Sequence, residues 1–106
     1  MSRPRVRLPE QTKVGEVIEV KTLISHVMET GQRKEADGRP IARSIINSFT
    51  ATFAGAEVFK AELHPGISAN PYLAFHMRVP GPGEFEFTWV DDSGVRIVEK
   101  QKLNVV

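Results

Sequence analysis

The chain has 106 residues, a length typical of one domain, so residues 1–106 are expected to fold as a single unit. Fourteen basic and thirteen acidic side chains leave a formal charge of +1, which excludes a generic polyanion binder and argues against a nucleic-acid partner. The absence of cysteine excludes disulfides, thiolate nucleophiles, iron–sulfur clusters and cysteine-ligated zinc.

Alternation of apolar and polar residues with a period of two dominates the chain and predicts antiparallel strands with one wet face each. A short first strand is expected near Arg5–Leu8. No apolar run is long enough to span a bilayer, so no membrane segment is expected. The apolar rows of the later strands are, in chain order, Ile18-Val20-Thr22-Ile24, Phe49-Ala51-Phe53, Phe59-Ala61-Leu63, Leu73-Phe75-Met77-Val79, Phe85-Phe87-Trp89 and Val95-Ile97-Leu103-Val105.

Residues typical of turns separate these rows. Ala54-Gly55-Ala56 suits a short hairpin with glycine at positive φ, Pro80-Gly81-Pro82-Gly83 forces a reversal, and Asp91-Asp92-Ser93-Gly94 is typical of a hairpin turn. Apart from one turn near Pro40–Ser44, no helical periodicity is visible. The pattern predicts an all-β fold, an immunoglobulin-like antiparallel β-sandwich of about seven strands without a disulfide.

Two loops stand out by their length. One runs from His26 to Ser44 and the other from His64 to Pro71, and loops this long in a compact domain are usually functional or mobile. We expect both to lie on the surface and to dock protein partners, with the basic members steering encounters with acidic surfaces or anionic cargo. The docking residues suggested by loop position are His26, Arg33, Lys34, Arg39, His64 and Asn70.

The three histidines raise the question of a metal. His26 and Met28 would point the same way in an extended chain, and His76 lies on the wet face of its strand. Imidazole and thioether groups suit copper, so a periplasmic copper-binding β-sandwich is an alternative function. No tight ligand spacing is present, which favours surface histidines and a core methionine, and we therefore expect no metal or cofactor site.

No arrangement of residues predicts catalysis. The sequence around His64 lacks the serine elbow and oxyanion hole of a hydrolase. Asp91 and Asp92 are explained by the turn that they open, and Glu84 and Glu86 share a strand face that should be solvated. We therefore expect a protein that is not an enzyme and has no catalytic residues.

The arginines Arg3, Arg5 and Arg7 would line one side of an extended N-terminal arm. Two interpretations stay open: these arginines attract an anion or an acidic partner, or they are edge charges that discourage aggregation. A third alternative is that the chain is a module that recognises carbohydrate or peptide. It needs an exposed aromatic platform, and only Tyr72 lies off the apolar faces.

Three longer stretches carry a family resemblance. The chain contains INSFTATF at 46–53, SANPYLAF at 68–75 and FEFTWVDD at 85–92. Together they resemble the SoxZ family, the Z subunits of the SoxYZ sulfur-carrier complexes of bacterial thiosulfate oxidation. The resemblance extends from about Arg3 to Val106, in one order and without large gaps.

The resemblance implies a division of labour between two chains. In that family the Y subunit carries sulfur intermediates on a cysteine in a glycine-rich C-terminal tail, and the Z subunit pairs with Y without a carrier cysteine. The lack of cysteine here agrees with the Z role, and no catalytic residue is carried over to any position. The resemblance therefore implies a non-catalytic subunit that forms a heterodimer with Y and transiently docks the other Sox enzymes.

The resemblance also implies work in the periplasm. Met1–Pro9 lacks the apolar core and cleavage site of a secretion signal, so we expect export together with a signal-bearing partner. Without Y, we expect the chain to self-associate through the surface that would otherwise bind Y, because an exposed apolar patch favours association with another apolar surface.

Overall fold

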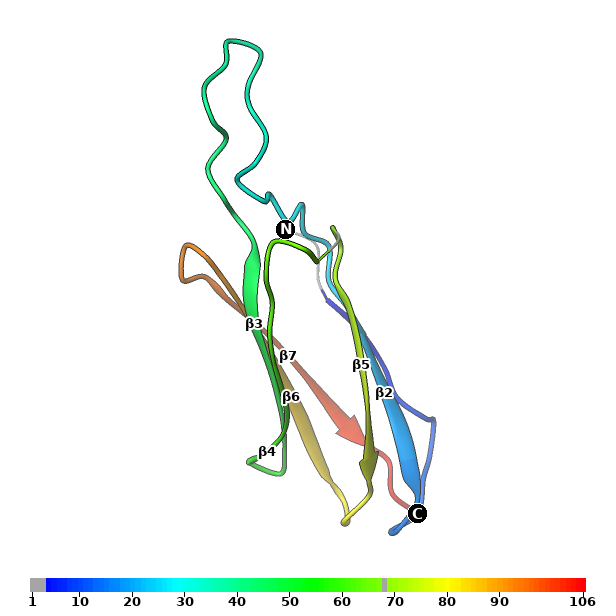
Figure 1. Cartoon of the computed structure of the whole chain (residues 1–106). Helices are drawn as coiled ribbons and strands as arrows, with labels where there is room; N and C mark the ends of the chain where they lie inside the picture. Colours follow the sequence, from blue (N-terminus) through cyan, green and yellow to red (C-terminus); the bar gives the residue numbers. More distant parts are fainter. Residues whose placement is uncertain (1–3, 68) are drawn as a thin grey trace.

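Seven antiparallel strands in two sheets make up the fold (Figure 1), and the prediction of an all-β sandwich without a disulfide is confirmed. The computed structural model describes residues 4–67 and 69–106. One sheet has three strands in the order β1-β2-β5, and the other has four in the order β4-β3-β6-β7. The strands are β1 (Arg5–Arg7), β2 (Val17–Leu23), β3 (Ile46–Phe53), β4 (Ala56–Glu62), β5 (Tyr72–Arg78), β6 (Gly83–Asp91) and β7 (Arg96–Leu103).

The apolar rows of the sequence face the space between the sheets. On β2 the side chains of Ile18, Val20 and Thr22 are buried, whereas Val17 before them and Glu19 between them are exposed. Strands β3 and β6 repeat the pattern, because successive side chains of a strand point to opposite faces of its sheet. The large side chains with the least exposure are Trp89, Phe49, Phe85, Phe87, Ile24, Ile45, Ile46, Val20 and Val79.

Aromatic rings join the two sheets at the centre of this core. Phe49 and Trp89 come from neighbouring strands, and their ring centroids are 5.0 Å apart. Phe59 of β4 stacks on Phe75 of β5 with centroids 4.8 Å apart and ring planes only 3° apart. Since β4 and β5 belong to different sheets, this stacked pair closes one side of the sandwich by apolar contact rather than by strand pairing.

The turns between strands follow the expected chemistry with one addition. Ala54 and Gly55 form a two-residue connection between β3 and β4, with φ angles of 51° and 85°. Two consecutive positive φ angles match the right-handed twist of a tight hairpin. The sequence predicted glycine in this role, but it gave no reason to expect alanine in the left-handed region as well.

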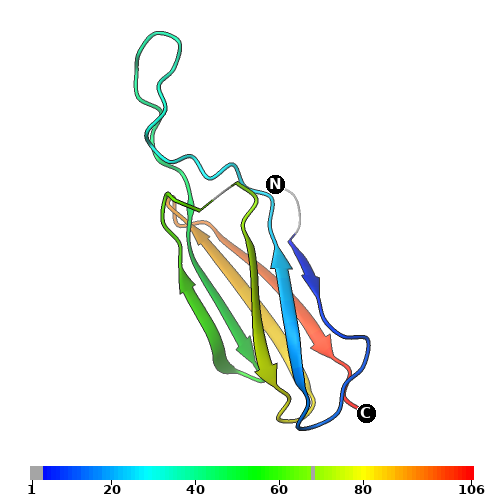
Figure 2. The same cartoon turned by 45° about the vertical axis from the view of Figure 1, so that its right-hand side comes forward.

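The connection between β2 and β3 leaves the sandwich as a long arm, residues 29–44 (Figures 1 and 2). It projects beyond one end of the sheets and accounts for much of the 59 Å length of a molecule only 20 Å wide. The turn predicted near Pro40–Ser44 is not helical, and that prediction was wrong. Instead, backbone bridges pair this stretch with the outgoing half of the arm.

None of the described residues forms a helix able to cross a membrane.

Candidate functional site

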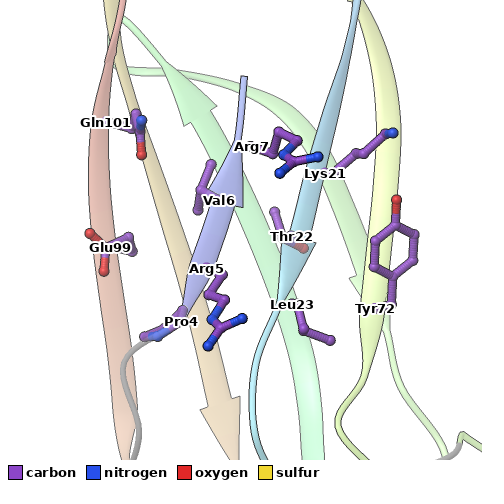
Figure 3. A pocket seen from close by; sticks show the side chains of 10 residues that line it. All are labelled: Pro4, Arg5, Val6, Arg7, Lys21, Thr22, Leu23, Tyr72, Glu99 and Gln101. Atoms are coloured by element: carbon purple, nitrogen blue, oxygen red, sulfur yellow. The ribbon is translucent and has the colours of Figure 1, made fainter. Parts of the chain in front are cut away.

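A groove opens along one side of the sandwich, between β1, an edge strand of the three-stranded sheet, and β7, an edge strand of the four-stranded sheet (Figure 3). Each of these strands is the last of its sheet, so each has one side without a strand neighbour. The groove has a volume of about 550 Å³. The side chains that give it its character are Arg5, Arg7, Lys21, Leu23, Tyr72 and Glu99.

Positive charge gathers on one wall of the groove. Arg5 and Arg7 are two residues apart on β1, so both side chains point away from the core, and both are exposed. Neither forms an ion pair with any residue that the structure describes. In the strand register Arg7 lies opposite Lys21, whose Nζ is 3.5 Å from a carboxylate oxygen of Glu19. Two guanidinium groups without an ion pair to a described residue therefore face the groove.

The remaining surface of the groove is apolar with a polar rim. Leu23 lies between Arg5 on one side and Tyr72 on the other, because β2 pairs with both β1 and β5 in register. Tyr72 is 56% exposed. On the opposite wall Glu99 is only 8% exposed and is engaged in an interaction of its own. The groove thus combines an apolar floor with charges at its edge.

The arm is a paired ribbon rather than an irregular loop. Glu29 and Ser44 exchange both backbone hydrogen bonds at 2.8 Å, and farther out the N–H of Ile41 donates to the carbonyl of Arg33 at 3.0 Å. Residues 31–40 are all exposed. A segment stabilised by its own backbone but without a core is suited to contact another molecule.

Asp92 fixes the root of the arm to the turn that follows β6. Its carboxylate accepts hydrogen bonds from Nε and Nη2 of Arg43 (2.9 Å each), from the N–H of Ile45 (3.1 Å) and from Nδ2 of Asn47 (3.0 Å). The guanidinium, helped by the two amide donors, holds the pKa of Asp92 well below its ordinary value, and the same contact raises the pKa of Arg43. The arm therefore has a defined direction where it leaves the sandwich.

The predicted role of the neighbouring aspartate in the turn is confirmed. Asp91 accepts hydrogen bonds from the N–H and Oγ of Ser93 at 2.9 and 2.6 Å and from the N–H of Val95 at 3.0 Å. The Ser93 hydroxyl, with the two backbone donors, lowers the pKa of Asp91. Asp92 has a second task that the turn motif did not indicate. Its main partner Arg43 lies 49 positions away in the sequence.

Two of the predicted docking residues, His26 and Asn70, lie together. The N–H of His26 donates to Oδ1 of Asn70 at 2.9 Å, and the N–H of Asn70 donates to the carbonyl of His26 at 2.7 Å. Asn70 has a φ of 53°, a conformation that asparagine tolerates better than most residues. These contacts join the two loops predicted to be functional at the base of the arm.

The other predicted docking residues are spread over two places. Arg33, Lys34 and Arg39 lie on the exposed arm. Arg33 pairs with Glu29 at 2.9 Å, and Arg39 is held by carboxylates of Asp37 (2.6 Å) and Glu35 (3.0 Å), so Lys34 is the arm cation without an ion pair to a described residue. His64 lies elsewhere, beside a hollow of about 590 Å³ on the outer face of the four-stranded sheet. The hollow is lined by the hydroxyl groups of Thr50, Thr52 and Thr88.

The geometry expected for a copper site is not formed by the residues proposed for it. Met28 has a φ of 55°, so the chain around it is not extended, and its buried sulfur accepts the N–H of Ile46 at 3.3 Å. Nδ1 of His26 accepts the N–H of Met28 at 2.9 Å, and His76 is on the outer face of β5 beside Glu19. Among the described residues no three His, Cys, Asp or Glu side chains are placed to hold a metal.

The groove itself was not predicted from the sequence. Its arginines were noted there, but the opposite wall comes from β7, more than ninety positions away. Only the closing of the two sheets brings Glu99 and Gln101 across from β1. The weak clue in the sequence was the exposed Tyr72, the one aromatic side chain off the apolar rows.

Comparison with solved structures bears on the fold. A superoxide reductase (neelaredoxin) from Ignicoccus hospitalis superposes with a TM-score of 0.73 at 15% identity, covering 99% of this chain and 81% of that chain. The sulfur carrier protein SoxY from Chlorobium limicola f thiosulfatophilum superposes with a TM-score of 0.71 at 11% identity, covering 100% of this chain and 81% of that chain. At these identities the similarity concerns the fold alone.

Comparison of sequences gives the family. A search of curated protein sequences finds no significant match. The sequence model of the family described as sulphur oxidation protein SoxZ matches residues 6–102. That match spans all seven strands, agrees with the resemblance of the strand motifs, and is accompanied by the fold shared with SoxY. The chain therefore belongs to the SoxZ family and is a subunit of a sulfur oxidation (Sox) system.

Proposed function

We propose that this chain is the non-catalytic subunit of a sulfur-carrier complex and pairs with a Y subunit whose C-terminal cysteine carries the intermediates of thiosulfate oxidation. The family match over residues 6–102 is the observation that carries the proposal. A fold shared with a sulfur carrier protein supports it, because related sandwiches are suited to pair as two unequal copies of one architecture.

The chemistry of a carrier favours this division of labour. A covalent sulfur carrier needs a mobile thiolate that enters several active sites. This chain has no cysteine, and its candidate groups are turn aspartates and paired arginines rather than an activated nucleophile. A chain without thiols also cannot trap the partner's carrier cysteine in a mixed disulfide. Its contribution is then a rigid platform and a docking surface.

We assign the docking of visiting enzymes to the arm and to the two loops joined at its base. The arm is long, exposed and held at a fixed angle by Asp92, which is more than a connection between two strands requires. His26 and Asn70 lie at its base, and Arg33, Lys34 and Arg39 lie along it. His64, on a different surface, is a separate docking candidate.

Shortening the arm tests this role without disturbing the sandwich. Because Ile41 and Arg33 are joined by a backbone hydrogen bond, residues 34–40 can be replaced by an Asn-Gly turn that closes the shorter ribbon. Pairing with the Y subunit should persist, and thiosulfate turnover by the reconstituted Sox enzymes should fall. Unchanged turnover together with unchanged pairing would exclude the arm from docking.

Electrostatic steering by the arm makes a second expectation. Two of its cations are already neutralised within the arm, so Lys34 carries most of the effect. Association rates with the visiting enzymes should decline as salt is added, and Lys34→Gln should flatten that decline. A flat salt response of the unmodified protein would rule steering out.

We further propose that the pair works in the periplasm after export with a signal-bearing partner, as in the family that the chain resembles. Fractionation of cells that express both chains tests this directly. The chain should be found in the periplasmic fraction only when the partner's signal is intact. Its appearance there without the partner would overturn co-export.

Alone, the purified chain should show concentration-dependent self-association that the Y subunit abolishes.

A further inference from the structure

The groove between β1 and β7 has the features of a site for an extended chain. Strand β1 pairs with β2 on one side, and no strand among the described residues 4–67 and 69–106 pairs with its other side, so this edge offers backbone groups for pairing. Addition of a strand to such an edge is a common way to bind a peptide. The groove beside the edge is open and about 550 Å³ in volume.

The charges of the groove indicate what kind of chain would fit. Arg5 and Arg7 are exposed and form no ion pair with a described residue, and Lys21 lies next to Arg7 in the register. Three cationic side chains and one carboxylate, Glu99, line the groove, a net charge of +2 where the whole chain carries +1. Such a surface attracts carboxylates, and a guanidinium binds a carboxylate through two parallel hydrogen bonds.

The spacing of the arginines selects a conformation. Side chains two positions apart on a strand are separated by roughly 7 Å, and a second extended chain beside β1 presents its own alternate side chains at the same interval. Carboxylates at alternate positions would therefore meet Arg5 and Arg7 in register, while the residue between them would face Val6 and the interior of the groove. Leu23 and Tyr72 lie on the other side of β1, on β2 and β5, and form an apolar surface beside the arginines.

We propose that this groove binds an extended acidic segment of a partner protein, which adds to the free edge of β1 with carboxylates at alternate positions facing Arg5 and Arg7. The inference depends on the groove alone and not on the proposed function. Its test also distinguishes the two interpretations of the N-terminal arginines, because charges that only protect an edge need no partner of matching spacing.

Two labelled peptides of equal composition test the proposal on the purified chain. Gly-Glu-Val-Glu-Val-Glu-Gly has carboxylates at alternate positions, whereas Gly-Glu-Glu-Val-Val-Glu-Gly has no two carboxylates that are two positions apart. Fluorescence anisotropy should show the alternating peptide binding at least about fivefold more tightly. Its binding should shift the backbone amide resonances of Arg5, Val6 and Arg7, the residues of the edge strand. Equal affinities of the two peptides, or no binding at millimolar concentration, would overturn the proposal.

Matched variants distinguish binding at Arg5 and Arg7 from nonspecific electrostatic attraction of the peptide to the chain. Arg5→Gln with Arg7→Gln should weaken binding about tenfold, and Arg5→Lys with Arg7→Lys should lie between, because the charge remains but the fork is lost. Lys100→Gln with Lys102→Gln removes the same charge from exposed positions on β7 and should change affinity less than about twofold. Equal losses in the arginine and lysine pairs would overturn the proposal.

A small anion is the remaining alternative ligand for the two arginines. Sodium sulfate, added at constant ionic strength, tests this alternative because sulfate carries negative charge but has no peptide backbone. If the site is built for a strand, sulfate should displace the alternating peptide only weakly and should leave the Val6 amide unshifted. Full displacement at equal concentration, with the same shifts as the peptide produces, would identify an anion site and contradict strand addition.

Discussion

The Asp92 carboxylate accepts two hydrogen bonds from the Arg43 guanidinium, each 2.9 Å long, and so ties the root of the arm to the turn after β6. A paired fork of this kind fixes direction as well as distance. The arm has no core of its own, so its orientation depends on this contact and on the backbone bonds between Glu29 and Ser44.

Removing the charge of Asp92 should free the arm while leaving the sandwich folded. In Asp92→Asn the amide accepts only part of the hydrogen bonding, and the ion pair is lost. Limited trypsin digestion should cut after Arg33 and Lys34 several-fold faster than in the unmodified protein. Asp37→Asn, which removes an ion pair at the arm tip, is the control and should have a smaller effect on cleavage after Arg33. Equal effects of the two variants would show that Asp92 does not set the order of the arm.

The same contact predicts a dependence of stability on pH. Hydrogen bonds from Arg43 keep the folded-state pKa of Asp92 below its unfolded value of 3.8. A carboxylate of this kind stabilises the fold above the unfolded pKa, and the contribution is lost as pH falls through the folded pKa. The difference in unfolding free energy between the protein and Asp92→Asn should therefore be constant from about pH 7 to 5 and shrink below about pH 4. Urea titrations at each pH measure it, and a constant difference down to pH 2 would be evidence against the contact in solution.

Asn70 should tolerate glycine better than alanine. Its φ of 53° is in the left-handed region, and its Oδ1 accepts the N–H of His26. Both substitutions remove the acceptor, but only alanine adds the steric cost of that conformation, which is about 1 kcal/mol. Thermal or urea unfolding should thus place Asn70→Ala about 1 kcal/mol below Asn70→Gly. Equal stabilities of the two variants would mean that residue 70 is not held in this conformation.

Two glycines of one turn should respond very differently to alanine. A Cβ at Gly83 would lie 2.8 Å from Cζ of Phe53, a ring that is 3% exposed and packs on Phe85. A Cβ at Gly81 would meet nothing within 4 Å. Gly83→Ala should therefore cost about 1–3 kcal/mol of unfolding free energy, as other overpacked cores do, and Gly81→Ala less than about 0.5 kcal/mol. If both variants unfold alike, Phe53 is not packed against the start of β6.

Periodicity was enough to predict the strands because burial on one sheet face is recorded locally in every second residue. The rows of β2 and β6 illustrate this, with Val20 and Phe87 buried as predicted. The roles of Asp92 and Asn70 depend on partners 49 and 44 positions away, which no local pattern contains. Met28 shows the limit of a local rule, because its positive φ removes the extended conformation in which it would align with His26, while its burial agrees with the core methionine that the sequence favoured.

The two candidate surfaces, like the fold, were only partly predictable from the sequence. The length and charge of the loop at 26–44 were visible in the sequence, but its paired backbone and fixed direction were not. The groove needs β1 and β7, from opposite ends of the chain, to meet across the sandwich. Arg5 and Arg7 were recognised as a pair, and only the fold supplies the apolar floor and the free edge beside them.

The most direct test of the account is to mix the purified chain with a tail-cysteine Y subunit, determine the mass of the assembly by sedimentation, and locate sulfur adducts by mass spectrometry after incubation with thiosulfate and the Sox enzymes. The account predicts an assembly with one copy of each chain and adducts on the partner's cysteine alone. Turnover of thiosulfate by this chain without the partner, or two chains that sediment separately at micromolar concentration, would contradict it.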